Sequence, residues 1–148
     1  MAYTSRELDA PAAEVWAVIV DPHTYPRWLI GASEIRSVDS QWPAPGSAFH
    51  HRIGVGPFKL ADKTTVKAID EGRRLELAVR ARPLVAATVR FGLVSDGRRT
   101  VLSFEEEPDP RLLGNLVRPV VDPLTHVRNH RSLRRLEQVV DERRSGRP

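Results

Sequence analysis

The stretch "APAAEVWAVIVDPHTYPRW", residues 10–28, predicts two short helices joined by a sharp corner. Pro11 suits the first turn of a helix, and the apolar residues after it repeat at helical spacing: Val15, Trp16, Val18 and Ile19. Asp21-Pro22 stops this helix, because proline has no backbone N–H and restricts the residue before it. One further helical turn is expected around Tyr25 to Trp28, and the loosely alternating residues 2–10 are expected to form a strand.

Residues 33–107 alternate between apolar and polar side chains with a period of two, which is typical of strands with one buried face. Turn residues interrupt the alternation at 43–46, 54–57, 70–72 and 96–97. The last of these, Asp96-Gly97, is a strong signal for a tight hairpin between "AATVRFGLV" and "RTVLSFEEE". Consecutive strands joined by short turns predict an antiparallel meander of about six strands.

A helical period returns in residues 111–144. Two prolines, Pro119 and Pro123, interrupt it, so we expect a kink or break there, with the better helix beginning near Asp122. The helix is expected to bury one stripe of side chains, to which steps of three and four residues assign Leu133, Leu136, Val140, Asn129 and His126.

Length and composition indicate one soluble domain, expected to span residues 1–144 with a disordered tail at 145–148. The chain is 41% hydrophobic and 28% charged, and no run approaches the roughly 18 apolar residues of a membrane helix, so no stable membrane insertion is expected. Cysteine is absent, which excludes a disulfide scaffold, a thiolate metal site and a cysteine nucleophile. The N-terminal residues contain no apolar signal segment, which favours a cytoplasmic location.

The basic charge of the chain is concentrated in its last quarter. Residues 111–148 hold nine arginines and four acids, a net charge of +5, whereas the other 110 residues carry a net charge of −1. A basic helix is usually a solvated face, and no aromatic residue lies among these arginines to stack on a base. We therefore expect no nucleic-acid partner, and binding of this helix to acidic lipid headgroups or to a partner protein is a third-ranked hypothesis.

The order of strand, two short helices, antiparallel strands and long terminal helix resembles the START-like helix-grip superfamily. More closely, it is similar to the branch known as polyketide cyclase/dehydrase and lipid transport. The resemblance is carried by residues 10–28, by "PAPGSAFHHRI" at 43–53 and by the amphipathic final helix. It implies an α+β fold in which a curved antiparallel sheet of about six to seven strands wraps around the C-terminal helix.

Such a sheet and helix leave a cavity between them, which suits a hydrophobic ligand with a few polar anchors. The expected ligand is a lipid, isoprenoid, quinone or polyketide-like molecule, bound by a monomer or homodimer without a cofactor. The residues expected to contact it are Trp16, Tyr25, Trp28, Phe49, Thr64, Leu77, Val79, Phe104, Asn129 and Leu133. For the two tryptophans, simple packing in the core is the favoured interpretation, because tryptophan is heavily buried in any fold.

Three residues are candidates for acid–base chemistry: His51, His126 and Asp62. His50 and His51 must face opposite sides of one strand, and His51 is favoured as the inward residue because it shares its phase with Phe49. Asp62 could tune an inward histidine, as could Glu105 or Glu106. An inward histidine would support the alternative function of a cyclase or dehydratase enzyme, whereas the histidine spacing predicts no metal site.

Overall fold

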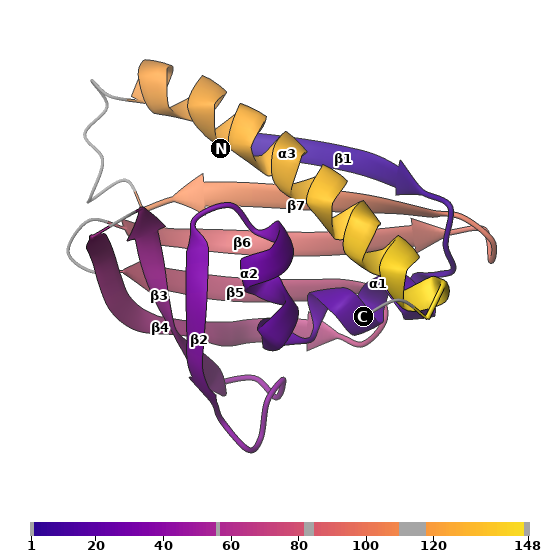
Figure 1. Cartoon of the computed structure of the whole chain (residues 1–148), viewed down its shortest axis with the longest axis horizontal. Helices are drawn as coiled ribbons and strands as arrows, with labels where there is room; N and C mark the ends of the chain where they lie inside the picture. Colours follow the sequence, from indigo (N-terminus) through magenta and orange to yellow (C-terminus); the bar gives the residue numbers. More distant parts are fainter. Residues whose placement is uncertain (1, 56, 82–84, 110–117, 147–148) are drawn as a thin grey trace.

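The protein is a seven-stranded antiparallel sheet that curves around one long helix (Figure 1). The computed structural model describes residues 2–55, 57–81, 85–109 and 118–146. The strands lie in the order β1-β7-β6-β5-β4-β3-β2, so each strand except β1 pairs with its neighbour in the sequence. The strands are β1 Ala2–Leu8, β2 Ala32–Val38, β3 Ala48–Val55, β4 Phe58–Asp70, β5 Arg74–Ala81, β6 Val85–Ser95 and β7 Thr100–Pro108.

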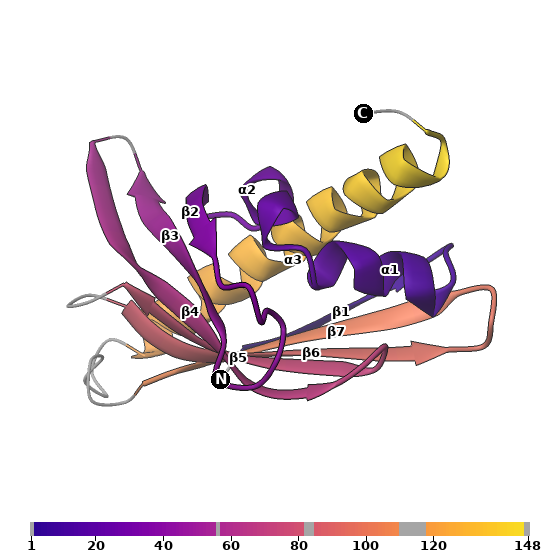
Figure 2. The ribbon, with the colours of Figure 1, turned by 90° about the horizontal axis from the view of Figure 1, so that it is seen from below.

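Four helical segments accompany the sheet: α1 Ala12–Ile19, the 3-10 turn η1 Pro22–Thr24, α2 Tyr25–Trp28 and α3 Arg118–Arg144. These segments lie on the same face of the sheet, and the opposite face is left uncovered by them (Figure 2). The helix-grip arrangement expected from the sequence is thereby confirmed. None of the helices in the described residues combines the length and apolarity that crossing a membrane requires.

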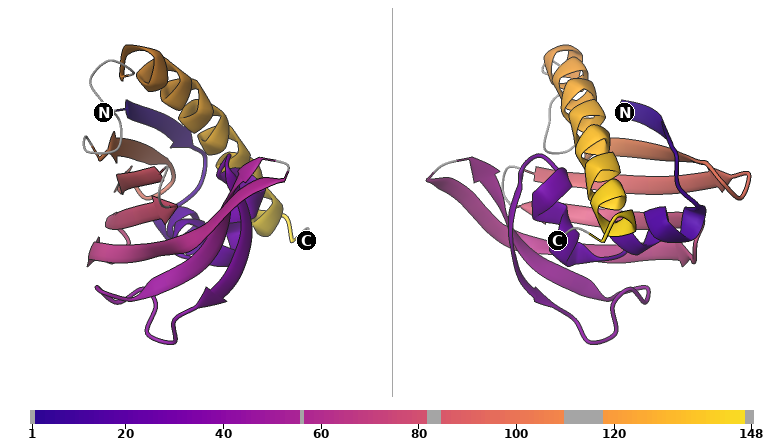
Figure 3. Two further views of the ribbon diagram at one scale, coloured as in Figure 1. Left: turned by 90° about the vertical axis from the view of Figure 1, so that its left-hand side faces the viewer. Right: turned by 45° about the vertical axis from the view of Figure 1, so that its right-hand side comes forward.

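The sheet bends most strongly on the side of β2, β3 and β4, which rise beside α3 (Figure 3). Register shifts accompany the bend, two between β2 and β3 and one between β4 and β5, at Val66/Ala68. Such irregularities place an extra residue on one strand and increase the local twist. The bend gives the sheet a concave face toward the helices and a convex face away from them.

The corner predicted at Asp21-Pro22 is held by buried hydrogen bonds. The Thr24 hydroxyl lies 2.8 Å from the carbonyl oxygens of Val18 and Asp21, and it accepts a hydrogen bond from the indole Nε1 of Trp28 at 3.0 Å. The Tyr25 hydroxyl donates to the carbonyl of Ile19 at 2.6 Å. Both ends of the corner are therefore tied to the last turn of α1, which fixes α2 over the concave face of the sheet.

The part of α3 from Asn129 to its end is anchored by burial and by ion pairs. Its buried side chains are Asn129, Ser132, Leu133, Leu136, Val139 and Val140. Arg6 of β1 holds Glu137 through two hydrogen bonds of 3.1 Å. Arg143 and Arg144 pair with Asp21 and Glu14, at 3.0 and 2.9 Å. Much of the positive charge at this end of the helix therefore binds acids of the same chain.

Two expectations for this helix require correction. The helix begins at Arg118 rather than near Asp122 and continues through Pro123. Because Pro123 lies within the second turn, it removes a backbone hydrogen bond only near the helix end. His126 is exposed rather than inward, with its Nδ1 3.4 Å from the hydroxyl of Thr4. Residues 111–117 and 147–148 lie outside the described residues, so the expected tail is represented by Ser145 and Gly146 alone.

Candidate functional site

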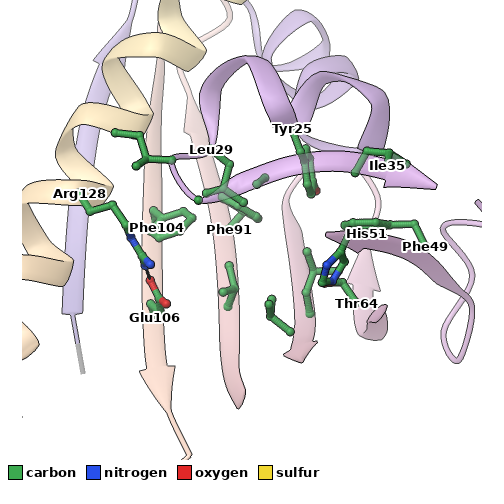
Figure 4. Close-up of a pocket in the computed structure, with 16 residues that line it drawn as sticks. Tyr25, Leu29, Ile35, Phe49, His51, Thr64, Phe91, Phe104, Glu106 and Arg128 are labelled. Carbon is green, nitrogen blue, oxygen red and sulfur yellow. Dashed lines mark hydrogen bonds and ion pairs between the residues drawn. The ribbon is translucent and has the colours of Figure 1, made fainter. Parts of the chain in front are cut away.

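A cavity of about 110 Å³ lies between the concave face of the sheet and the helices (Figure 4). Its wall is mostly hydrocarbon, and the polar side chains on it are few: Tyr25, His51, Thr64, Glu106 and Arg128. Buried aromatic rings form its interior, including Phe49, Phe91 and Phe104. A space of this kind is the usual setting for a small hydrophobic ligand.

The register of the sheet explains why these side chains meet. Phe49 of β3 lies opposite Thr64 of β4, which lies opposite Val79 of β5. In the next row toward β1, Leu77 lies opposite Val89, which lies opposite Glu106 of β7. Residues opposite each other in an antiparallel sheet share a face, so both rows point toward α3.

The half-buried part of the wall is the turn between α2 and β2, where Leu29 to Ala32 and then Ile35 border the cavity. The backbone N–H of Ile30 donates to the buried hydroxyl of Ser132 on α3, at 3.1 Å. This bond ties the turn to α3. The partial exposure of the turn makes it the entrance side of the cavity.

His51 forms the deep polar end of the cavity. The residue is 2% exposed, and its Nε2 lies 2.8 Å from the hydroxyl of Thr64. Burial lowers the pKa of His51 to about 4, although the nearby carboxylate of Asp62 and the backbone of Lys63 favour the protonated ring. Nδ1 is buried and has no partner of normal hydrogen-bond geometry. His51 is therefore a neutral imidazole near pH 7 with one unsatisfied nitrogen.

Glu106 and Arg128 form the other polar end. Their side chains make an ion pair and are 14% and 36% exposed. Asn129, which is fully buried, donates from Nδ2 to the same Glu106 oxygen at 3.1 Å. The Asn129 carbonyl oxygen accepts from Nε and Nη2 of Arg128, at 3.2 and 3.0 Å. The two polar ends are separated by the aromatic interior, as Figure 4 shows.

The structure brings six of the ten residues expected to bind ligand onto one wall, together with the acid–base candidate His51. The six are Tyr25, Phe49, Thr64, Leu77, Val79 and Phe104. Trp16, Trp28 and Leu133 are buried in the core and lie outside the cavity wall. Asn129 also lies behind the wall, where it contacts Glu106 and Arg128. Their roles in ligand binding stay predictions.

The three acid–base candidates do not converge. Asp62 lies directly opposite His51 in the register of β3 and β4 but is half-buried and outside the cavity wall. His126 is exposed and likewise outside the wall. The side chain that sequence reasoning missed is Arg128, which pairs with Glu106, one of the two glutamates considered as partners of an inward histidine. A largely buried carboxylate is normally paired, and this is the signal that could have pointed to a nearby cation. Among the described residues, no three His, Asp or Glu side chains are grouped closely enough to hold a metal ion.

Residues 2–141 match the family described as "Polyketide cyclase / dehydrase and lipid transport". The chain belongs to this family. The match spans every strand of the sheet and most of α3, so the cavity falls entirely within the family domain. No curated protein matches the sequence of this polyketide cyclase/dehydrase and lipid transport family member.

Solved structures share the fold of this family member at low sequence identity. A START superfamily protein from Mycobacterium smegmatis is 15% identical, with a TM-score of 0.78, and the match covers 95% of this chain and 97% of that one. The Zhui aromatase/cyclase from Streptomyces sp. R1128 is 14% identical, with a TM-score of 0.72 and coverage of 96% and 93%. A protein from Thermus thermophilus is 18% identical, with a TM-score of 0.69 and coverage of 94% and 95%. The chain thus shares its helix-grip fold with these three proteins.

The site offers binding chemistry more readily than covalent chemistry. Its interior can exclude water from an apolar ligand, and His51 and Thr64 can offer hydrogen bonds at the deep end. The part of the wall formed by described residues contains no cysteine, serine or lysine to act as a nucleophile. At the other polar end of the cavity, the Glu106 carboxylate and the Arg128 guanidinium neutralise each other.

Proposed function

We propose that this family member binds a compact hydrophobic small molecule in the cavity between the sheet and α3. The observation that supports the proposal is the apolar, partly enclosed wall, in which buried aromatic and aliphatic side chains surround empty space. Native interiors are normally packed to the density of organic crystals, so a space of this size is uncommon without a ligand. Family membership supports the same class of ligand.

The cavity volume narrows the ligand class. A dry apolar cavity of about 150 Å³ is known to accept a benzene molecule. The space here is smaller, about 110 Å³, but it is only partly enclosed, so a single ring or a short branched chain fits if part of it reaches into the entrance beside residues 29–32. A long acyl or isoprenoid chain would have to extend through the entrance beside residues 29–32. The deep end would then hold the ring or chain terminus, with a hydrogen-bonding group near His51.

A cavity-filling variant tests this proposal. Val79 lies on the cavity wall, and Val79→Phe puts a ring into the space that the ligand would occupy. We expect purified wild-type protein to bind one-ring probes such as acetophenone in isothermal titration calorimetry, and Val79→Phe to lose at least tenfold in affinity. The matched control is Val94→Phe, because Val94 is 75% exposed and lies outside the cavity wall. Equal affinity in all three proteins would refute binding in this cavity.

The alternative is a cyclase or dehydratase that uses His51 as a general acid or base. The buried Nδ1 of His51 favours it, since a ring nitrogen without a hydrogen-bond partner is available to exchange a proton or a hydrogen bond with a substrate. The lowered pKa opposes it, because a general base works best when its pKa lies near the working pH, and about 4 is far below neutrality. The neutral ring is better suited to hydrogen bonding, so ligand binding is the function that we propose.

A pH profile separates the two functions if a substrate is found. An enzyme that depends on neutral His51 should lose kcat/KM as the pH falls through about 4, and His51→Gln should abolish turnover while substrate still binds. Turnover by His51→Gln at the wild-type rate would remove the general-base role.

A further inference from the structure

We propose that Glu106 makes the cavity selective for uncharged ligands by occupying the guanidinium group of Arg128. The inference rests on the proposed function and assigns a charge class to its ligand. It begins with the direction of Glu106, which lies between Ala2 and Val89 in the register of β1, β7 and β6. Both neighbours are buried, so the carboxylate points to the concave face, whereas Glu105 beside it faces the convex side and approaches Arg90 at 3.9 Å.

Arg128 is the side chain that would otherwise attract an anionic ligand. An arginine on the wall of an apolar cavity is well suited to clasp a carboxylate with two parallel hydrogen bonds. Here Nη2 is already used by Glu106, and Nε and Nη2 both donate to the amide oxygen of Asn129. Asn129 itself is fully buried, so this edge of the guanidinium is held in place from behind.

The charges on the described part of the wall cancel. Glu106 and Arg128 contribute one charge of each sign, and His51, with its pKa near 4, adds none around pH 7. A ligand carboxylate entering this space would lose hydration and meet the Glu106 carboxylate along with its partner. An uncharged ligand loses far less hydration and leaves the ion pair intact. The geometry therefore favours a neutral molecule over an anion of the same shape.

Acetophenone and benzoate form a matched pair of probes, because a methyl group in one replaces a charged oxygen in the other. At pH 7 we expect the wild-type protein to bind acetophenone at least tenfold more tightly than benzoate, by calorimetry or ligand-observed NMR. Glu106→Gln keeps the shape and removes the charge, which frees Arg128 to attract an anion. We expect this variant to lower the preference for acetophenone by about tenfold, as one removed charge a few ångströms away allows.

The matched control is Glu105→Gln, which removes the same charge from the convex face and should keep the wild-type preference. Arg128→Gln should change the preference in the opposite direction. Without Arg128, the Glu106 carboxylate should repel benzoate more strongly than it does in the wild type. A cooperative thermal unfolding transition shows that each variant is folded. If Glu106→Gln does not fold, Arg128→Gln still tests whether the ion pair sets the preference between the two probes.

The outcomes separate this inference from the proposed function. Equal binding of both probes by the wild type, or a preference unchanged in Glu106→Gln, would overturn the role of Glu106 while ligand binding stands. No binding of either probe to the wild type would instead overturn ligand binding by the cavity, and the inference with it. If Glu105→Gln lowered the preference for acetophenone as much as Glu106→Gln does, the net charge of the protein would explain the effect. The selective role of Glu106 would then be overturned.

Discussion

Burial of His51 couples the stability of the protein to pH. The pKa is lowered from 6.5 to about 4, mainly because burial disfavours the charged ring. Between these values the unfolded chain binds a proton that the folded chain does not. The stability that the neutral His51 ring contributes is therefore fully present above about pH 6.5 and is lost as the pH falls toward 4. Each pKa unit corresponds to about 1.4 kcal/mol, which makes the loss from this residue on the order of 3 kcal/mol.

Urea unfolding at pH 7 and pH 4.5 measures this loss. His51→Gln keeps a hydrogen-bonding partner for Thr64 but does not titrate, so the variant should lose less stability than the wild type over the same interval. His50→Gln is the control, because His50 is half-buried on the other side of the strand, 3.7 Å from Asp39. If the free energy of unfolding fell equally with pH in the wild type and in His51→Gln, the lowered pKa of His51 would not be the cause of the loss.

Single residues of the site differ in how far the sequence could reveal them. His51 was predictable because Phe49, two residues earlier, sets the inward phase of the strand. His126 was not, because periodicity gives the direction of a side chain but not how closely that turn of the helix packs on the sheet: His126 lies 3.4 Å from the Thr4 hydroxyl, yet it stays exposed. Arg128 was missed because an arginine on a helix usually faces solvent, and only the position of Glu106 shows its role.

Among the elements, the corner between α1 and α2 depends on the hydroxyl of Thr24. Thr24→Val preserves the shape of the side chain but leaves the indole N–H of Trp28 without its acceptor. Trp28 is fully buried, so water cannot replace the lost partner. We expect the free energy of unfolding to fall by about 1–3 kcal/mol, the usual cost of an unsatisfied buried polar group.

Chemical denaturation of Thr24→Val beside Thr65→Val checks this expectation. Thr65 is half-buried on β4, next to the inward Thr64, and valine is favourable in a strand. Thr65→Val should therefore change stability by less than about 0.5 kcal/mol. A similar small effect in both variants would show that the corner is held by apolar packing alone.

The elements themselves were largely visible in the sequence. Asp21-Pro22 and Asp96-Gly97 were both predicted as breaks, and the structure has a corner and a hairpin at these places. At the hairpin, Asp96 accepts hydrogen bonds from the N–H groups of Arg98 and Arg99, both at 2.9 Å. The start of α3 was not predicted. Local propensity places a break at a proline, whereas the first turn of a helix tolerates proline because its N–H groups lack partners within the helix.

For the whole molecule, the cavity depends on how far the sheet bends, which no local pattern determines. The alternation of residues predicted which side of each strand is buried, yet the bend arises with the register shifts at β2–β3 and β4–β5. These shifts are relations between strands rather than properties of one segment. The same limit applies to the distance between Glu106 on β7 and Arg128 on α3, which are brought together only by the docking of the helix.

That docking is uneven along α3, which predicts how the molecule responds to a ligand. Among the helix side chains from Pro123 onward, the first buried one is Asn129, and Pro123, Leu124, His126 and Val127 before it are exposed. The far half buries Leu133, Leu136, Val139 and Val140. Because local opening is easiest where few apolar side chains are buried, residues 124–129 should exchange their amide hydrogens at least tenfold faster than residues 133–140.

A ligand in the cavity should slow amide exchange chiefly at residues 124–129 of α3 and at residues 29–35. Arg128 and the turn after α2, which belong to these two segments, both line the cavity. With acetophenone at a hundred times its Kd, linkage permits a stabilisation of about 2.7 kcal/mol for openings that release the ligand. Hydrogen-exchange mass spectrometry of wild type and Val79→Phe, with and without acetophenone, measures this. Equal exchange along the free helix would contradict the uneven docking of α3. Slowing by acetophenone in Val79→Phe as well would mean that the ligand binds outside this cavity.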